Sequence, residues 1–243
     1  CAIDGDFNND FEVNVVDLVI LVNWIFDDSA PYEIADLNED GNVNVVDIVT
    51  HVSWVLYGIP EPDIFVKTFG GNYIDGGESL ELTSDGGYII TGYTQSFGDN
   101  NLTNVWLIKT DSNGNEEWNK TFGGSYVDWG MSVKQTSDGG YIITGHTRSF
   151  GNGFVDVWLI KTDSNGNEDW SNTFGGIGDD YGYSVQETLD GGYIITGHTN
   201  SFNDNIDVWL IKTDSNGDEV WNNTFGGIGD DYGYSVQETL DGG

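Results

Sequence analysis

Two patterns of hydrophobic and polar positions divide the chain near residue 63. Before this point, polar stretches at residues 6–17 and 36–47 each run into an apolar stretch, at residues 18–26 and 48–56. Beyond it, short apolar runs such as Tyr-Ile-Ile and Val-Trp-Leu-Ile alternate with turn sequences rich in Gly, Asn and Asp. Longer apolar runs after a polar loop predict helices, and short runs bounded by turns predict strands.

The part after residue 63 predicts four strands in each unit of about 52 residues. In the second unit the predicted strands are 131–135, 141–147, 156–162 and 168–174. Asp-Gly-Gly separates the first pair and Asp-Ser-Asn-Gly-Asn the last pair, and both are strong turn signals. The apolar runs are hydrophobic at consecutive positions, so both faces of these strands are expected to be buried between stacked sheets.

The repeat period predicts β-propeller blades. Thr-Phe-Gly-Gly begins at Thr68, Thr121, Thr173 and Thr224, with spacings of 53, 52 and 51 residues. The Asp-x-x-Gly-x-x-x-Trp spacing within each unit resembles the quinoprotein-type propeller repeat, and the wider unit resembles blade repeats of microbial surface proteins. A β-solenoid is the rival architecture. Three units are complete and a ring usually needs 4–8 blades, so an incomplete ring in a truncated chain is expected.

The charge of the chain excludes one class of partner and separates the two parts. The sequence has 41 acidic and 7 basic side chains, a formal net charge of −34. No Lys/Arg stripe exists to bind nucleic acid phosphates. Residues 1–63 carry 14 of the acids and no Lys or Arg. Halophilic adaptation alone predicts even acidity, which this skew opposes. No apolar run approaches the roughly 18 residues that span a bilayer.

Two twelve-residue loops, 6–17 and 36–47, repeat the same spacing of oxygen-bearing side chains. Three carboxylates with neutral oxygens suit Ca²⁺ better than Mg²⁺, and neither loop has the His or Cys that transition metals prefer. A polar turn is the alternative for one loop, but two copies in register favour metal. The predicted ligands, with a backbone carbonyl from Glu12 and Asn42, are Asp6, Asn8, Asp10, Glu12, Asn14, Asp17, Asp36, Asn38, Asp40, Asn42, Asn44 and Asp47.

A calcium loop followed by a helix, twice over, resembles the type I dockerin family across residues 4–58. A calcium-sensor EF-hand needs an entering helix and a bidentate Glu at loop position 12, where this chain has Asp17 and Asp47. The resemblance implies a small all-α domain that binds two Ca²⁺ ions and docks onto a cohesin module in a cellulosome-like assembly. It places the docking contacts at Val15, Val16, Val22, Asn23, Val45, Val46, Val52 and Ser53.

The sequence departs from the dockerin pattern at two places, and two of the expected docking residues have an alternative role. Phe11 stands where loop position 6 usually has Gly, and a left-handed backbone there costs a side-chain-bearing residue ~1–2 kcal/mol. The helix positions that are often basic in the family are Val22 and Asn23 in the first copy. For Val16 and Val46, a place in the hydrophobic core is the alternative to docking. Because the copies match, either is expected to serve as the docking face.

The predicted organisation is a dockerin at residues 1–59, a linker at 60–66 and a partial propeller at 67–243. No catalytic site is visible. His146 and His198 occupy a position that holds Tyr93 in the first unit, which favours aromatic packing over catalysis. For Asp179-Asp180, a solvated turn is favoured over an ion site.

The expected function is non-catalytic docking at an extracellular location or the cell surface, with a surface or glycan ligand for the propeller. The alternative is a polysaccharide-degrading enzyme, tethered by the dockerin, whose catalytic part lies outside this sequence.

Overall fold

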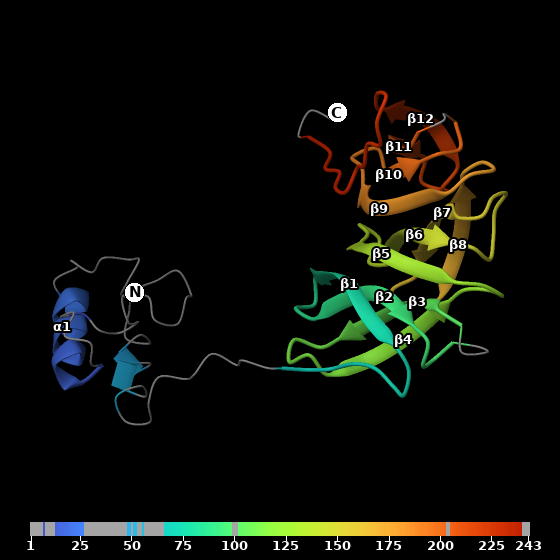
Figure 1. Cartoon of the computed structure of the whole chain (residues 1–243). Helices are drawn as coiled ribbons and strands as arrows, with labels where there is room; N and C mark the ends of the chain where they lie inside the picture. Colours follow the sequence, from blue (N-terminus) through green and yellow to red (C-terminus); the bar gives the residue numbers. More distant parts are fainter. Residues whose placement is uncertain are drawn as a thin grey trace. The chain divides into compact units, whose positions relative to one another are not determined.

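The chain forms two compact units, Cys1–Ile64 and Phe65–Gly243. The computed structural model describes residues 7, 13–26, 48–49, 51–52, 55, 66–98, 102–202 and 205–239 (Figure 1). The division lies beside the change of pattern at residue 63, while the finer limits of dockerin, linker and propeller remain predictions. No helix among the described residues is long and apolar enough to cross a membrane.

In the first unit, helix α1 spans Val15–Phe26, within which the first predicted helix lies. Asn14 precedes the helix, and its Oδ1 accepts a hydrogen bond of 2.8 Å from the backbone N–H of Val16. This is the contact of a helix N-cap, which satisfies a donor that has no partner inside the helix. Leu21 is fully buried on the inner face of the helix.

Residues of both copies of the duplicated segment contribute to the core of this unit. The described residues of the second apolar stretch, 48–49, 51–52 and 55, have helical backbone. His51 is fully buried, and its ring stacks on that of Phe7 with the centroids 5.4 Å apart. His51 occupies the repeat position of Leu21, so the duplicated position is buried in both copies.

The second unit consists of three four-stranded sheets, each an antiparallel meander in chain order. A solenoid would pair successive repeats in parallel, whereas the ladders of all three described sheets are antiparallel. The strands are β1 (Asp75–Leu82), β2 (Tyr88–Thr94), β3 (Asn104–Thr110), β4 (Glu116–Phe122), β5 (Asp128–Gln135), β6 (Tyr141–Thr147), β7 (Asp156–Thr162), β8 (Glu168–Phe174), β9 (Asp180–Glu187), β10 (Tyr193–Thr199), β11 (Asp207–Thr213) and β12 (Glu219–Phe225).

Three of the four strands predicted in the second repeat have the observed bounds, but β5 begins earlier than residue 131. It starts at Asp128 and contains a bulge between Gly130 and Ser132. A Cβ atom on Gly145 would lie 1.8 Å from the Trp129 carbonyl oxygen, so only glycine lets the two strands approach there. The bulge interrupts the period-two pattern by which a strand is recognised, and this explains the missed residues.

The hydrophobic core lies between the sheets, which are stacked face to face (Figure 1). Neighbouring residues of β6 point in opposite directions: Ile143 packs with the first sheet and Ile142 with the third. The prediction of strands buried on both faces is therefore confirmed. Each fully buried Ile or Leu contributes roughly 1.5–3 kcal/mol, and the repeated apolar runs supply several to every interface.

The strands β1, β5 and β9 hold successive sheets in the same register. The hydroxyl of Ser79 accepts a hydrogen bond of 3.4 Å from the N–H of Val133. One repeat later, the hydroxyl of Ser132 accepts an equal bond from the N–H of Val185. Because the same atoms meet at both interfaces, the sheets follow one another by a constant step.

Candidate functional site

The carboxylate of Asp17 closes the first predicted calcium loop. Its side chain is fully buried. Oδ1 accepts a hydrogen bond of 2.8 Å from the N–H of Phe7, and Oδ2 accepts one of 3.0 Å from the N–H of Asn14. Phe7 and Asp17 are the second and last residues of the loop 6–17, so the Asp17 side chain joins the two ends of this loop. A carboxylate also supplies the oxygen atoms that Ca²⁺ prefers as ligands, so Asp17 has the chemistry expected of the last loop position.

The donor set around Asp17 fits calcium in its chemistry. The ligands that the structure describes, Asn14 and Asp17, offer oxygen and no nitrogen or sulfur ligand. Oδ1 of Asn14 caps α1, which leaves one further lone pair on that oxygen. Among the described residues, no group of three or more His, Cys, Asp or Glu side chains is arranged for a metal ion. The remaining predicted ligands lie outside the described residues: Asp6, Asn8, Asp10, Glu12, Asp36, Asn38, Asp40, Asn42, Asn44 and Asp47.

The predicted docking residues of the first copy lie along the outer side of α1. Val15 and Val16 are 61% and 51% exposed, so the alternative that Val16 belongs to the core is wrong. Asn23 is exposed and Val22 half-buried. In the second copy, Val52 is half-buried, while Val45, Val46 and Ser53 lie outside the described residues.

Two exposed apolar residues of this unit were missed by the sequence reasoning. Val19 is 55% exposed and Val49 is 64% exposed, and they stand 30 residues apart at the same repeat position. The sequence signal was the apolar residue at this position in both copies, which was read only as part of a helix. Such a repeated apolar residue can also lie on the surface. With Val15 and Val16, Val19 forms an exposed apolar strip on the first two turns of α1.

Two polar features of the sheet unit serve its folding. Asp180 is fully buried, and its Oδ2 accepts hydrogen bonds from the Gly176 N–H and the Ser201 hydroxyl, at 2.9 and 2.6 Å. The prediction of a solvated turn is thus wrong for Asp180. Its side chain fastens the start of β9 to the loop that follows β10.

The histidines of the sheet unit lie in a row of aromatic rings, as predicted. His146 lies 5.8 Å from Trp129 and 4.7 Å from Tyr181 between ring centroids, and His198 lies 4.8 Å from Tyr181. Burial, with a smaller contribution from His198, lowers the pKa of His146 to about 4. A neutral imidazole packed between rings is consistent with the role expected for it.

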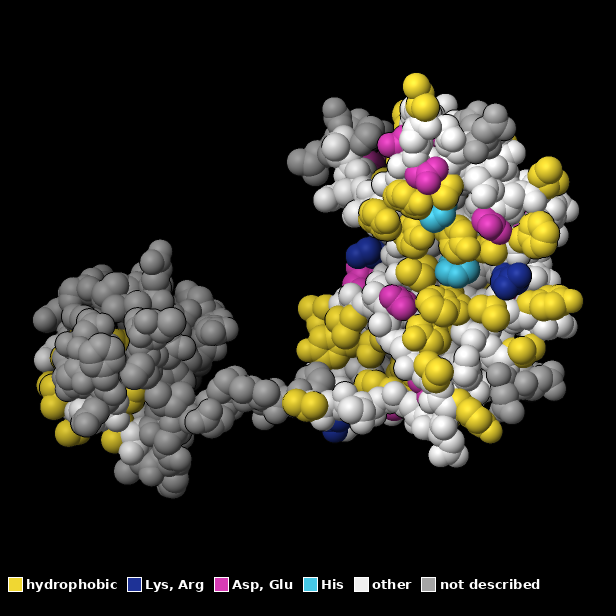
Figure 2. Space-filling view, viewed as in Figure 1, with side chains coloured by type: hydrophobic (Ala, Val, Ile, Leu, Met, Phe, Trp, Pro, Cys, Tyr) yellow, Lys and Arg dark blue, Asp and Glu magenta, His cyan; other side chains and the backbone are white. Residues whose placement is uncertain are grey.

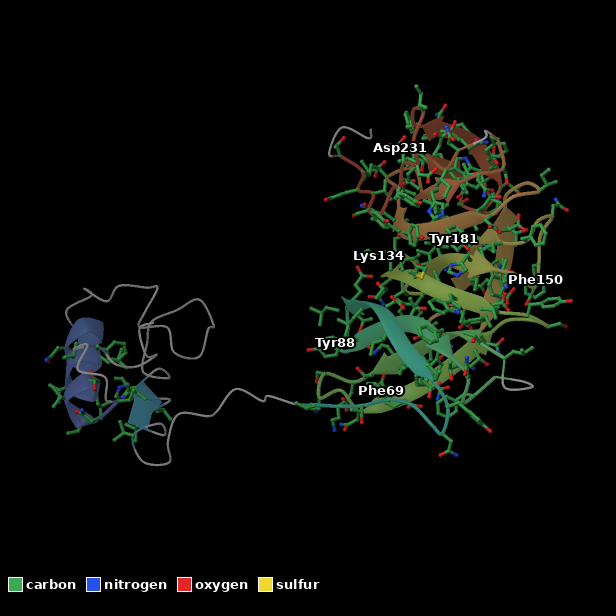
Figure 3. All side chains as sticks on the ribbon, viewed as in Figure 1. Phe69, Tyr88, Lys134, Phe150, Tyr181 and Asp231 are labelled. Atoms are coloured by element: carbon green, nitrogen blue, oxygen red, sulfur yellow. The ribbon has the colours of Figure 1, made fainter. Side chains whose placement is uncertain are left out.

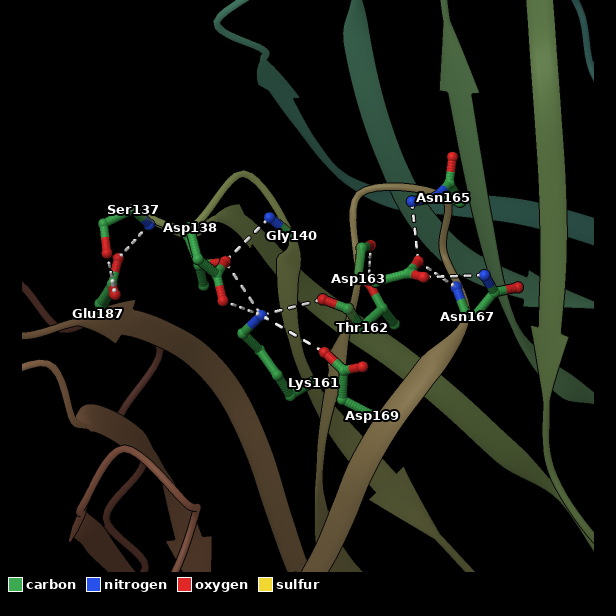
Figure 4. Close-up of polar contacts among 11 residues, drawn as sticks. Ser137, Asp138, Gly140, Lys161, Thr162, Asp163, Asn165, Asn167, Asp169 and Glu187 are labelled. Atoms are coloured by element: carbon green, nitrogen blue, oxygen red, sulfur yellow. Dashed lines mark hydrogen bonds and ion pairs between the residues drawn. The ribbon is translucent and has the colours of Figure 1, made fainter.

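A second polar feature of the repeats is an ion pair that ties the third strand of each sheet to the turn between its first two strands. The amine of Lys161 on β7 lies 2.9 Å from Oδ2 of Asp138, in the turn between β5 and β6 (Figure 4). The same pairs join Lys109 to Asp85 at 2.8 Å and Lys212 to Asp190 at 2.9 Å. These contacts recur in each repeat, which indicates a structural role.

Comparison with known families and structures places the first unit. The model of the dockerin type I domain matches residues 4–50. No curated protein matches the chain. Solved structures that are similar include a protein of unknown function from Bacteroides caccae, with 10% sequence identity and a TM-score of 0.28. The match covers 61% of this chain and 67% of that one.

Another similar structure is that of Sqt1 from Chaetomium thermophilum, with 10% identity and a TM-score of 0.35. The match covers 63% of this chain and 36% of that one. On the family match alone, residues 4–50 are a dockerin type I domain. The sheets described above make the rest of the chain a β-rich region of three four-stranded sheets, compatible with propeller-like blades.

Proposed function

We propose that this protein is a calcium-dependent docking module joined to a β-propeller interaction domain. The docking module, residues 1–59, plugs into a cohesin module of a scaffold, and a linker at 60–66 connects it to the propeller part at 67–243. The observation that carries the proposal is the dockerin type I match at residues 4–50. It falls on the two loops whose side chains carry the oxygen spacing of calcium sites.

Each loop binds one Ca²⁺ ion in this proposal. The geometry of Asp17 supports it, because a buried carboxylate at the end of the loop already draws the first turn of α1 toward Phe7. Residues 1–63 carry 14 acidic and no basic side chains. Two Ca²⁺ ions would offset part of this repulsion, so metal binding and folding of a small all-α domain are coupled.

The docking face is apolar. The exposed strip of Val15, Val16 and Val19 offers a cohesin a hydrophobic contact in place of a salt-bridged one. The residues at the matching repeat positions of the second copy are Val45, Val46 and Val49, and Val49 is exposed. Apolar side chains exposed together mark interaction surfaces more often than single exposed ones, and the in-register duplication supports two alternative binding modes.

The propeller part, with blades of about 52 residues, contributes a second interaction, with a surface or glycan ligand. A chain that docks onto a scaffold and holds such a ligand works outside the cell or at its surface. The three sheets stacked at a constant step support blades of one propeller.

A pull-down of the full chain on immobilised type I cohesin modules, with 2 mM Ca²⁺ or with excess chelator, tests the docking function. We expect retention in Ca²⁺ and release in chelator. A double Asp17→Asn and Asp47→Asn variant should not be retained in either buffer. Retention that survives the chelator would reject calcium-dependent docking.

A further inference from the structure

A groove between the second and third sheets collects aromatic side chains around the one arginine of the sequence. Its volume is about 520 Å³, within the range of small-ligand sites. Both sheets that form it are complete. Figure 2 shows histidine and hydrophobic side chains gathered on one face of this unit, and Figure 3 labels Tyr181 within it. The residues that line the groove and carry the argument are Trp129, His146, Arg148, Asp179, Tyr181 and Tyr183.

Neighbouring rings stack against Trp129 and Tyr181. Tyr93 stacks on Trp129 with centroids 4.3 Å apart, and His198 stacks on Tyr181 at 4.8 Å. Trp129 and Tyr181 remain half-buried, and where stacking covers the face of a ring, its edge is the part left for a ligand. The edge of an aromatic ring carries partial positive charge. It therefore suits a ligand rich in oxygen atoms better than a purely apolar one.

Arg148 departs from the repeat. The equivalent positions hold Gln95 and Asn200, so packing of the repeat does not require a cation here. The Arg148 side chain is exposed, and within the described residues its guanidinium forms no ion pair, although Asp179 lines the same groove. By contrast, Lys109, Lys161 and Lys212 are each paired with carboxylates. A planar guanidinium without a partner is suited to bind a carboxylate with two parallel hydrogen bonds.

Two tyrosines add hydroxyl groups that remain protonated. Burial raises the pKa of Tyr181, an effect to which Asp179 adds and which Arg148 opposes. Burial also raises the pKa of Tyr183. Both phenols are therefore neutral at physiological pH and able to donate or accept hydrogen bonds.

The charge of the chain limits how acidic the ligand is. With a net charge of −34, the protein repels a polyanion. One arginine can balance one carboxylate, not a series of them. A ligand with many hydroxyl oxygens and a single acid group satisfies the ring edges, the phenols and Arg148 together.

We propose that this groove binds an oligosaccharide of neutral sugars that carries one uronic acid. The carboxylate pairs with Arg148, and the sugar hydroxyls contact the edges of Trp129 and Tyr181 and the phenol of Tyr183. This inference rests on the proposed function in taking the sheet unit as the ligand-binding part of the chain, and it does not depend on cohesin docking.

Isothermal titration of the full chain in Ca²⁺ with three oligosaccharides tests the site. The probes are xylotetraose bearing one glucuronic acid, unsubstituted xylotetraose, and a pentamer of galacturonic acid. We expect the singly substituted probe to bind about tenfold or more tightly than the other two, the effect of one charge-assisted contact. Equal affinity for substituted and unsubstituted xylotetraose, tightest binding of the pentamer, or no binding of any probe would overturn the proposal.

The variant Arg148→Gln installs the residue found at the equivalent position 95, so the fold is expected to tolerate it. It should lower affinity for the substituted probe to that for unsubstituted xylotetraose. Lys134→Gln, on β5 but lining another groove, is the matched control and should bind as the wild type does. Unchanged binding by Arg148→Gln would refute the assignment. Cohesin pull-down of the same variant tests docking separately, so either function can fail without the other.

Discussion

The amine of Lys161 lies 2.9 Å from Oδ2 of Asp138, although 5% of the lysine side chain and 63% of the aspartate side chain are exposed. The amine also donates a 3.0 Å hydrogen bond to the Thr162 carbonyl. Burial opposes ionisation of Asp138, but hydrogen bonds from Thr136, Lys161 and Gly140 outweigh it and lower its pKa to about 2. The aspartate thus brings a nearly buried lysine charge into contact with the solvent-exposed turn.

Replacing Lys161 with Met keeps most of the buried stem and removes the amine. We expect the free energy of unfolding to fall by about 1–2 kcal/mol, because the Thr162 carbonyl and Asp138 both lose a donor. Urea denaturation of the full chain would measure the change. Lys67→Met removes an exposed amine that bonds Asn115, and should cost less than about 0.5 kcal/mol. Equal losses in the two variants would contradict a structural role for the buried pair.

The stability of the sheet unit should depend on His146 between pH 4 and 6.5. Its pKa is lowered to about 4 in the folded protein, against about 6.5 in an unfolded chain. As pH falls through this window, the unfolded state takes up a proton that the folded state refuses, so stability decreases. The stabilisation is fully present above pH 6.5. Between pH 6.5 and 4, the free energy of unfolding falls by up to about 1.4 kcal/mol for each unit by which the pH is lowered.

The variant His146→Tyr, which copies Tyr93 of the first repeat, should flatten this dependence. Urea midpoints measured from pH 4 to 8 would compare it with the wild type. His198, whose pKa is also lowered by burial, and carboxylates with a lowered pKa, such as Asp138, contribute to the slope that remains. A variant whose slope matches the wild type would show that His146 is not the titrating group.

Calcium removal should unfold the first unit and spare the second. The acidic loops lose the ions that offset their repulsion, whereas the three sheets are held by apolar interfaces. In chelator, circular dichroism of the full chain should lose helical signal at 222 nm and keep its strand signal. Restoring Ca²⁺ should reverse the loss in the wild type but not in the double Asp17→Asn, Asp47→Asn variant. An unchanged helical signal in chelator would reject the coupling.

Cohesin docking should survive loss of one valine face and fail when both are lost. Val16→Asp alone, or Val46→Asp alone, should reduce affinity by less than about threefold, because the other copy still docks. The double variant should lose about a hundredfold or more, since charged groups replace exposed apolar contacts in both modes. Surface plasmon resonance on immobilised cohesin measures both. A hundredfold loss from one single variant would indicate a single binding mode.

The sequence by itself determined the local elements of this protein. The bounds of β6, β7 and β8 follow from apolar runs closed by Asp-Gly-Gly and Asp-Ser-Asn-Gly-Asn turns, because hydrogen bonds within a few residues define such turns. The calcium-loop spacing likewise lies within twelve consecutive residues, and its duplication was sufficient to identify the dockerin. These features depend on neighbours along the chain, so a pattern in the chain is enough to predict them.

Only the tertiary structure decided which residues meet across the sheets. It buried Asp180, extended β5 back to Asp128, and left Val16 exposed. It also brought Arg148 to one groove with Trp129 and Tyr181, which lie on separate strands. The physical reason is that these contacts depend on the step between stacked sheets and on close approaches at glycine, neither of which leaves a periodic signal in the sequence.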